Sequence, residues 1–315
     1  MIAIGIDVGG MSIKGGSVSL DGKVLETFVM PVIKGEKQDI TINKLIDALK
    51  AFINEHHYEG QILGIGLGIP GMIDSPKGIV FASSNLKWEN LPIVKMLDDA
   101  FHLPIKITND ANAAALGEAI FGAGSKYNSS IMITLGTGVG GGVIIDHKLF
   151  EGNEGKGTEL GHMVIVPNGL PCGCGRKGCL EQYASASALI RETKQAMIEH
   201  KDSKMWSLVN SIDEVNGKTV FDGVALNDTC AKEVLDNYIF YLGEGLLNFC
   251  NIFRPNVIIL SGGIAKQGEN LNSRLRAYMA DRNYGYTNSP VVDLVSATLG
   301  YNAGIIGAAA LIINK

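Results

Sequence analysis

Residues 159–181 are the most informative segment of the chain, and they read ELGHMVIVPNGLPCGCGRKGCLE. Cys172, Cys174 and Cys179 lie here among glycines, which let the backbone wrap closely around a small centre. Three thiolates and the imidazole of His162 would complete a tetrahedral zinc shell. The alternatives are free thiols or a disulfide, and a disulfide would leave one cysteine unpaired and require an oxidising compartment. The ligand chemistry favours a structural zinc site.

Two glutamates flank this segment. Glu159 lies one helical turn before His162, and Glu181 follows Cys179 closely. If zinc takes one ring nitrogen of His162, the second nitrogen can point at something else. We therefore expect the imidazole and both carboxylates to converge on a ligand rich in hydroxyl groups. The alternative is that both glutamates are solvated surface residues, the usual place of this residue type.

Size and composition limit the class of protein. A chain of 315 residues is long enough for two domains with hydrophobic cores. Its hydrophobic content of 46% and charged content of 19% are typical of a globular soluble protein. The net charge of −5 argues against a nucleic-acid or anionic-membrane partner. Neither a signal-peptide pattern nor an apolar run of roughly 20 residues is visible, so we expect a cytoplasmic enzyme with reduced thiols.

Glycine turns follow three predicted strands. The chain has 40 glycines, nearly twice the average usage of about 7%. Backbone N–H groups in such turns can bind phosphate, and an aspartate at a strand end suits hydrated Mg²⁺, although glycine turns are also commonplace. The second turn matches neither the P-loop nor the dinucleotide fingerprint. Its likeness to the first suggests two similar halves, each presenting a hairpin to one nucleotide, while the third turn could admit the flat face of a base. The residues concerned are Asp7, Gly9 and Gly10 in the first turn, Gly136, Thr137 and Gly138 in the second, and Gly262 and Gly263 in the third.

Asp110 follows a short predicted strand at residues 105–108 and begins a predicted helix. One interpretation is a helix N-cap, a position that Asp fills well. The other is a general base at the carboxyl end of a sheet strand, where open α/β folds bind ligands. The two interpretations are compatible. In the polar loop at residues 83–88, Trp88 is interpreted as a packing anchor, and Asn85 could reach a ligand.

The remaining elements come from hydrophobic periodicity and turn signals. Residues 203–224 are polar and lack a clear period. We expect further strands at residues 2–8, 11–20, 23–32, 61–69, 131–135, 143–145 and 257–260, and helices at residues 41–55, 93–101, 185–200, 235–253 and 303–313.

Over essentially its full length the chain resembles the ROK family of sugar kinases and repressors. The segment around the cysteines is the most specific part of the likeness. The segments that carry it are Asp7-Val8-Gly9-Gly10 with Lys14, Asn109-Asp110 with Ala111-Asn112-Ala113-Ala114, residues 135–142, Glu159-Leu160-Gly161-His162, and residues 172–181.

The resemblance implies an actin-like, ribonuclease-H-like α/β fold with two α/β domains around a cleft. It assigns residues 1–109 plus 301–315 to a small domain, and residues 110–300 to a larger domain with the zinc-binding loop. It also implies ATP, Mg²⁺ and structural zinc as cofactors, a sugar as substrate, and a homodimer.

Site residues follow from the same resemblance. Asp110 would take the proton from the attacking sugar hydroxyl, and His162 would both bind the sugar and complete the zinc shell. Met11 stands where the family usually has threonine, and Ser12 could substitute for it. The implied sugar ligands are Gly71, Asn85, Asn109, Asp110, Glu159, His162 and Glu181, and the implied nucleotide ligands are Asp7, Gly9, Gly10, Lys14, Gly136, Thr137, Gly138, Gly262 and Gly263.

The implied activity is that of an ATP-dependent hexose kinase. The NLKW loop and the TNDANAAALGE segment resemble the glucokinase branch, which phosphorylates the 6-hydroxyl of glucose. An N-acetylmannosamine kinase would share every motif. The family's sugar-responsive repressors carry a helix-turn-helix before the first strand, whereas this sequence begins at that strand and has Asp110, so we expect an enzyme.

Overall fold

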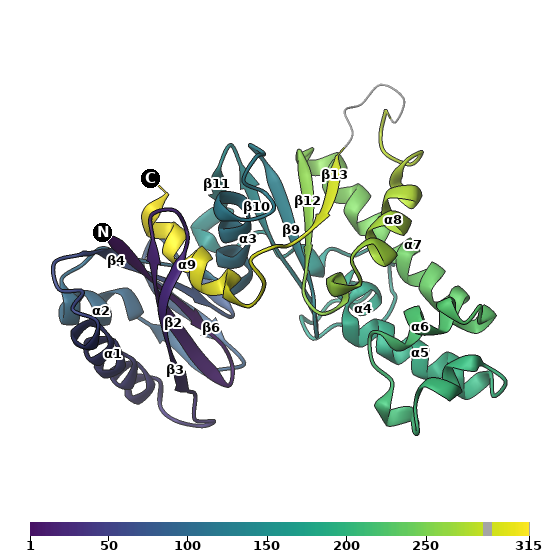
Figure 1. The fold of residues 1–315 in the computed structure, drawn as a ribbon, viewed down its shortest axis with the longest axis horizontal. Coiled ribbons are helices and arrows are strands. Elements are labelled where there is room, and N and C mark those ends of the chain that lie inside the picture. The colour runs from purple at the N-terminus through teal and green to yellow at the C-terminus, as the bar shows by residue number, and fades with distance from the viewer. Residues whose placement is uncertain (286–291, 315) are drawn as a thin grey trace. The chain divides into compact units, whose positions relative to one another are not determined.

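The computed structural model describes residues 1–285 and 292–314, which form two compact units built of helices and strands (Figure 1). The first unit comprises Met1–Ser130, Gly142–Thr158 and Thr298–Lys315, and the second comprises Ile131–Gly141 and Glu159–Ala297. Residues 286–291 and Lys315 belong to the predicted domains but lie outside the described residues. The predicted α/β class is confirmed.

The compact units differ from the predicted domain bounds chiefly at residues 110–130 and 142–158, and by three residues at 298–300. The sequence prediction assigned all three segments to the second domain, whereas they lie in the first unit. The physical reason is helix α3 (Asp110–Phe121), which packs closely on helix α9 (Ala303–Ile313). A Cβ atom on Gly117 of α3 would lie 2.9 Å from the backbone nitrogen of Gly307 in α9.

Five strands of the first unit form a sheet in the order β3-β2-β1-β4-β8. Strand β2 runs antiparallel to both β1 and β3, and β4 and β8 continue the sheet parallel to β1. The sequence predicted all five strands to within one residue at each end. Their bounds are β1 Ile2–Val8, β2 Ser12–Ser19, β3 Val24–Pro31, β4 Ile62–Ile69 and β8 Ile105–Asn109.

The two faces of this sheet are covered differently (Figure 1). Helices α1 (Gln38–Glu55) and α2 (Ile93–Phe101) pack on the face that carries the large side chains of β1, such as Ile4 and Ile6. Helix α9 packs on the opposite face, to which Ala3 contributes. Successive residues of a strand point to opposite faces, so this alternation of large and small residues decides which helix each face receives.

Glycines bring α9 unusually close to the sheet. A Cβ on Gly5 of β1 would lie 1.9 Å from the carbonyl oxygen of Ile305. A Cβ on Gly66 of β4 would lie 1.8 Å from the carbonyl oxygen of Ala308. Both contacts are with helix backbone, so neither position can accept a larger residue without moving α9.

A small sheet of order β5-β6-β7 also belongs to the first unit. The sequence analysis did not predict it, because its strands are only three to five residues long. Trp88 begins β7 and is 1% exposed within the hydrophobic core, which confirms it as a packing anchor. The bounds are β5 Met72–Asp74, β6 Ile79–Ser83 and β7 Trp88–Leu91.

A second five-stranded sheet has the order β11-β10-β9-β12-β13. The chain crosses between the units at residues 130–131, at the start of β9, and at residues 141–142, within β10. Strands β12 and β13 pair in parallel. The bounds are β9 Ser130–Leu135, β10 Val139–Ile145, β11 Lys148–Phe150, β12 Val257–Ser261 and β13 Asp293–Ser296.

Most of the remaining second unit is helical. Helix α7 begins six residues earlier than predicted, because Asp228 caps it by accepting a hydrogen bond from the Ala231 N–H at 3.0 Å. The polar region at residues 203–224 contains short turns and most of α6. The helices are α4 Glu181–Ala184, α5 Ala186–Glu199, α6 Thr219–Ala225, α7 Thr229–Phe253 and α8 Glu269–Met279, and the chain's 3₁₀ turns are Asn153–Gly155, Leu160–His162, Lys204–Leu208, Ile212–Glu214, Ile264–Gln267 and Gly300–Asn302.

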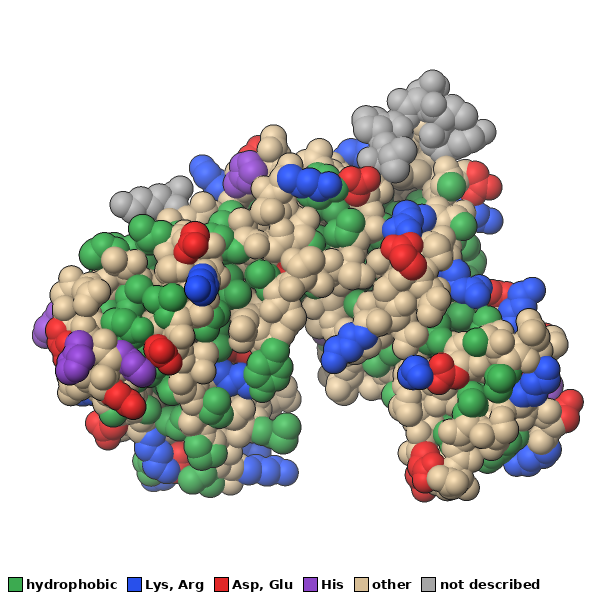
Figure 2. All heavy atoms as spheres, in the orientation of Figure 1, with side chains coloured by type: hydrophobic (Ala, Val, Ile, Leu, Met, Phe, Trp, Pro, Cys, Tyr) green, Lys and Arg blue, Asp and Glu red, His purple; other side chains and the backbone are tan. Residues whose placement is uncertain are grey.

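Two surface properties bear on partners. None of the described helices has the length and apolar character needed to cross a bilayer. On the face drawn in Figure 2, lysine and arginine side chains alternate with aspartate and glutamate side chains over the described residues of each unit. That face therefore presents no extended patch of one charge sign among those residues.

Candidate functional site

The first unit gathers its predicted site residues at the carboxyl ends of neighbouring strands. Asp7 of β1 pairs with Gly68 of β4, and Gly68 pairs with Thr108 of β8. Asp110 follows two residues later, and a Cβ on Gly68 would lie 3.4 Å from the Asp110 Cα atom. Open α/β sheets bind ligands at this edge. The fold thus places Asp7 and Asp110 at one edge of the sheet.

Asn109, not Asp110, is the N-cap of α3. The Asn109 Oδ1 atom accepts hydrogen bonds from the backbone N–H groups of Ala111 at 2.8 Å and Asn112 at 3.4 Å. Asp110 is the first residue of the helix, and its Oδ1 accepts from the Ala111 N–H at 3.0 Å. The capping interpretation of Asp110 is therefore wrong. Both residue types cap helices well, and Asn109 is the cap because it has the extended backbone dihedrals of an N-cap residue.

Two further predicted sugar ligands lie near this helix start or the first glycine turn. The Asn109 Nδ2 atom donates to the Gly71 carbonyl at 3.2 Å. Gly71 has φ +116°, and a Cβ there would lie 2.3 Å from the Ala82 carbonyl oxygen, so the position requires glycine. Asn85 is exposed, and its Cβ lies 4.0 Å from the position a Cβ would take on Gly10. Asn85 therefore borders the predicted phosphate turn.

The turn after β1 holds Asp7 beside Lys14. The two residues pair across β1 and β2, and the Gly9 N–H donates to the Ser12 carbonyl at 2.9 Å to close the turn. Burial raises the pKa of the Asp7 carboxyl above its ordinary 3.8, and the Lys14 ammonium partly opposes this rise. Met11, which replaces the family threonine, is 87% exposed.

In the second unit, the predicted zinc ligands lie together. The ligand atoms of His162, Cys172, Cys174 and Cys179 are all within 4.8 Å of one another. The sulfurs of Cys174 and Cys179 are 3.6 Å apart, and His162 Nδ1 lies 3.5 Å from the Cys172 sulfur. A tetrahedral zinc site with Zn–S bonds of about 2.3 Å has sulfurs about 3.8 Å apart, so the donor set fits zinc. Burial raises the pKa of Cys179 to about 12, so without a metal this thiol keeps its proton. A bound metal ion would replace that proton.

Glu181 joins this cluster to the second glycine turn. One carboxylate oxygen accepts a hydrogen bond from the Val139 N–H at 3.1 Å, and the other lies 3.7 Å from the Cys172 sulfur. A Cβ on Gly138 would lie 2.1 Å from the first of these oxygens. A larger residue at position 138 would therefore displace the carboxylate.

The second and third glycine turns are neighbours. Gly262 has φ +90°, and a Cβ there would lie 2.5 Å from the Leu135 carbonyl oxygen. Only glycine lets the backbone at position 262 pass this close to Leu135. Leu135 directly precedes Gly136, whose N–H donates to the Gly138 carbonyl at 3.0 Å. A Cβ on Gly136 or on Gly263 would meet no atom within 4 Å among the described residues. That open space suits a ligand that approaches the backbone of both turns.

Glu159 is exposed and precedes the 3₁₀ turn Leu160–His162, whose His162 N–H donates to the Glu159 carbonyl at 3.0 Å. Its convergence with Glu181 on one ligand stays a prediction. The site residues fall in two groups. Asp7, Gly9, Gly10, Lys14, Gly71, Asn85, Asn109 and Asp110 belong to the first unit, and Gly136, Thr137, Gly138, Glu159, His162, Cys172, Cys174, Cys179, Glu181, Gly262 and Gly263 belong to the second.

The role of Glu118, a buried acid of the first unit, was not predicted from the sequence. Glu118 of α3 is 0% exposed, and its carboxylate accepts hydrogen bonds from the backbone N–H groups of Ala123 at 2.9 Å, Thr298 at 2.9 Å and Leu299 at 2.7 Å. It thereby fixes the backbone that enters α9. The available signal was a glutamate in the otherwise small and apolar run of residues 113–121.

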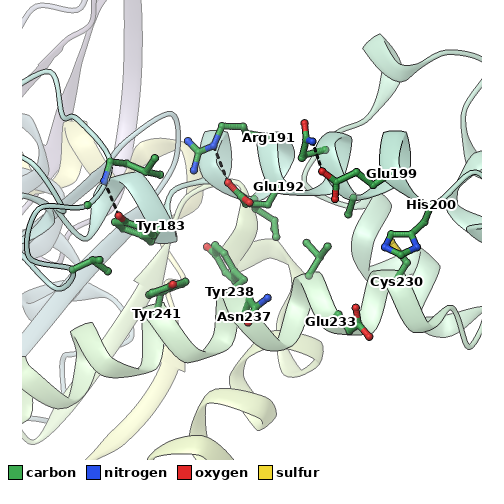
Figure 3. Close-up of a pocket in the computed structure, with 17 residues that line it drawn as sticks. Tyr183, Arg191, Glu192, Glu199, His200, Cys230, Glu233, Asn237, Tyr238 and Tyr241 are labelled. Atoms are coloured by element: carbon green, nitrogen blue, oxygen red, sulfur yellow. Dashed lines mark hydrogen bonds and ion pairs between the residues drawn. The ribbon is translucent and has the colours of Figure 1, made fainter.

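A cavity of about 680 Å³ lies elsewhere in the second unit, between α5 and α7 (Figure 3). The tyrosines 183, 238 and 241 and the acids Glu192, Glu199 and Glu233 are among the residues that line it. None of the predicted sugar, nucleotide or zinc ligands does. This cavity is therefore distinct from the candidate site.

Comparisons with known proteins cover nearly the whole chain. The ROK family pattern matches residues 3–315. The glucokinase of Halalkalibacterium halodurans is 34% identical over 314 residues, which span 98% of this chain and 94% of that protein. The xylose repressor of Bacillus spizizenii is 33% identical over 314 residues, or 99% of this chain and 77% of the repressor.

A solved structure gives the same result. The crystal structure of a ROK family glucokinase from Streptomyces griseus, in complex with glucose and AMPPNP, matches with a TM-score of 0.79 and 34% identity over 99% of each chain. Because ROK sugar kinases have the actin-like ATPase fold, the predicted fold is confirmed. From its motifs, its fold and these full-length similarities, the chain belongs to the ROK family.

Proposed function

We propose that this chain is an ATP-dependent hexose kinase, and specifically a glucokinase that phosphorylates the 6-hydroxyl group of glucose. The observation that carries the proposal is the Asp110 carboxylate, placed at the carboxyl end of β8 by the capped start of α3. It stands in a chain similar over 99% of its length to a glucokinase crystallised with glucose and AMPPNP.

Asp110 acts as the general base. Phosphoryl transfer depends mainly on alignment and charge stabilisation, so the base needs to accept the hydroxyl proton only as the new O–P bond forms. The hydrogen bond from the Ala111 N–H orients this carboxylate at the helix start. Rigid positioning of the attacking hydroxyl then supplies much of the rate enhancement.

The other sugar ligands hold the remaining hydroxyls. Asn109 has one N–H left for a sugar hydroxyl, beyond the bonds it makes to Gly71 and α3. Asn85 adds a second amide in the same unit. From the second unit, Glu181 and Glu159 offer acceptors, and His162 offers the ring nitrogen that does not face Cys172.

The nucleotide is bound by the glycine turns, with Lys14 directed at its phosphates. Asp7 would hold the Mg²⁺ ion through a carboxylate oxygen, which is the ligand type this cation prefers, and the ion would neutralise phosphate charge. Thr137 and Gly138 supply backbone N–H groups and a hydroxyl, Gly136 leaves open space for the close approach of the ligand, and Gly262 and Gly263 lie beside the base.

Zinc has a structural role in this proposal. The four-ligand cluster would hold zinc with no open coordination position for chemistry. Its function is to fix the irregular segment at residues 159–181, so that His162 and Glu181 keep their orientation toward the sugar. The protein would be found in the cytoplasm, where the thiols stay reduced, and would form a homodimer.

The experiment that tests the proposal measures ADP formation with ATP, Mg²⁺ and a panel of glucose, mannose, fructose and N-acetylmannosamine. We expect the highest kcat/KM with glucose and a product phosphorylated at the 6-position. A preference for N-acetylmannosamine would make that kinase the correct assignment. Absence of turnover with every sugar would overturn the kinase proposal.

The match to the xylose repressor favours one second candidate, a sugar sensor without catalysis. Both classes would bind sugar, so binding alone does not separate them. Asp110 does, because a sensor has no need of a base. Sugar-dependent ADP formation that disappears in Asp110→Asn would exclude the sensor, whereas sugar binding without any ADP formation would support it.

A further inference from the structure

Tyr301 is a feature of the first unit that the proposed mechanism does not use. It lies in the 3₁₀ turn Gly300–Asn302 that leads into α9, and its side chain is 77% exposed. Large aromatic side chains are commonly buried for most of their surface. A tyrosine as exposed as Tyr301 therefore needs an explanation. Its ring is covered on one face by a cation: the Lys14 Nζ atom lies 3.7 Å from the ring centroid.

The backbone just before Tyr301 is held in place by hydrogen bonds to Glu118. The buried carboxylate of Glu118 accepts the N–H groups of Thr298 and Leu299, the residues just before this turn. Gly300 follows with φ +57°, a dihedral that favours glycine and reverses the chain. Charge-assisted hydrogen bonds to a fully buried acid are strong. The ring therefore projects from a rigid support and not from a loose loop.

Lys14 needs such a partner. It lies on β2 opposite Asp7, and no ion pair ties it to a carboxylate within the described part of the chain. A lysine side chain has several freely rotating bonds, and ordering it costs up to about 2 kcal/mol of conformational free energy. Helix α9 also packs against the Asp7 carboxyl, since a Cβ on Gly304 would lie 2.6 Å from Asp7 Cγ.

We propose that Tyr301 is a positioning residue, whose ring holds the Lys14 ammonium beside Asp7 so that its remaining N–H groups are directed at the nucleotide phosphates. An ammonium over an aromatic face keeps its charge and can donate in other directions. Tyr301 thus orders Lys14 before the nucleotide arrives, which lowers the cost of binding. This inference rests on the proposed function, because it takes the ligand to be a nucleoside triphosphate.

The test compares Tyr301→Leu, which keeps an apolar side chain but removes the ring, with Tyr301→Phe, which keeps the ring. A cation–π contact at an exposed site corresponds to a two- to fivefold change in dissociation constant, to order of magnitude. We expect Tyr301→Leu to weaken ATP binding by about that factor and raise the KM for ATP, with kcat and the KM for hexose unchanged. Tyr301→Phe should restore wild-type values.

Two further measurements separate positioning from a loss of folding. The ε-methylene protons of Lys14 should show an upfield ring-current shift by NMR in the wild-type protein and in Tyr301→Phe, and lose it in Tyr301→Leu. In Lys14→Ala, the additional change Tyr301→Leu should have no further effect on ATP binding. Thermal unfolding of all variants should stay near the wild-type midpoint, because the ring is exposed.

The possible outcomes distinguish the two proposals. If the wild-type protein binds no ATP by calorimetry, the proposed kinase function fails. If it binds ATP and Tyr301→Leu binds equally well, or Tyr301→Phe is as weak as Tyr301→Leu, only the role of Tyr301 is overturned. Additive losses in the Lys14 and Tyr301 double variant would also contradict it, since the effect would then not pass through Lys14.

Discussion

The two groups of candidate site residues are held in place by different physical means. In the first unit, Asp7 and Asp110 lie at the ends of regular elements whose cores are packed and whose caps are formed. The segment at residues 159–181 has one 3₁₀ turn, the first residue of a short helix and two isolated β-bridges, Val164 with Cys179 and Pro171 with Lys177. Its centre is the Cys/His cluster. The proposed base and magnesium ligand thus depend on hydrophobic packing, whereas the proposed sugar ligands His162 and Glu181 would depend on a metal.

The largest expected effect tests the packed side of this comparison. Asp110→Asn keeps the shape of the side chain and its place at the start of α3 but cannot accept the proton. We expect kcat to fall by about 10²- to 10⁴-fold, with little change in hexose affinity. Stopped assays of sugar phosphate and calorimetry with the hexose measure the two quantities. An unchanged kcat would place the base at another residue.

The next effect tests the metal-dependent side. Cys174→Ser should lose zinc, because serine is a poor ligand for this ion, and hexose affinity should fall by at least about tenfold as His162 loses its orientation. ATP affinity should fall less than hexose affinity, since Asp7, Gly9, Gly10 and Lys14 of the proposed nucleotide site belong to the first unit. Metal analysis and calorimetry provide the readouts, and Cys250→Ala, a buried thiol outside the cluster, is the matched control. Normal hexose affinity in a zinc-free variant would break the comparison.

A smaller effect examines the link between the cluster and the glycine turn. In Gly138→Ala, the added Cβ would meet the Glu181 carboxylate at 2.1 Å, so the carboxylate must move and release the Val139 N–H. A hydrogen bond to a charged group contributes about 1.5–3 kcal/mol, and we expect a rise of about tenfold in the hexose KM. Gly173→Ala serves as the control, because its Cβ meets no described atom within 4 Å. Equal behaviour of the two variants would contradict a role for the Glu181 position.

The smallest effect concerns stability and pH. Burial raises the pKa of Asp7 in the folded protein above 3.8, so the folded state binds this proton more readily than the unfolded state. Stability therefore increases as pH falls through the window between the raised value and 3.8, and the ionised carboxylate is unfavourable above it. Asp7→Asn should raise the free energy of unfolding near neutral pH, with zinc content unchanged.

Denaturant unfolding of the wild type and Asp7→Asn across that window measures the difference. The advantage of the variant should shrink as the pH falls toward 3.8. The difference between the two proteins is the useful quantity, because they are identical at every other residue. A variant that is less stable than wild type at neutral pH would show that Asp7 makes favourable contacts that outweigh its burial.

Sequence reasoning succeeded where a pattern is local. Strand β1 and helices α2 and α9 were predicted with their observed bounds, because hydrophobic period and flanking turns define them. The four predicted zinc ligands also lie together as expected, since cysteine chemistry leaves few alternatives. Local pattern could not choose between Asn109 and Asp110 as the cap, because both residues cap well.

The features that sequence missed depend on contacts between distant residues. Nothing near Glu118 indicates that it binds the backbone of Thr298 and Leu299, and nothing near Lys14 indicates the ring of Tyr301. The strands β5 to β7 are too short to show a period. Such features become visible only when the chain is folded, since they combine segments separated by more than a hundred residues or elements below the length of any period.

The close seating of α9 against Gly5 and Gly66 has a consequence for biosynthesis. The ribosome makes β1 before α9, and the whole of Glu159–Ala297 is synthesised between them. Until α9 emerges, one face of the earliest sheet lacks its cover and keeps small apolar residues exposed to water. The second unit can therefore fold before α9 packs on the sheet of the first unit. The nascent chain needs protection from aggregation during that interval.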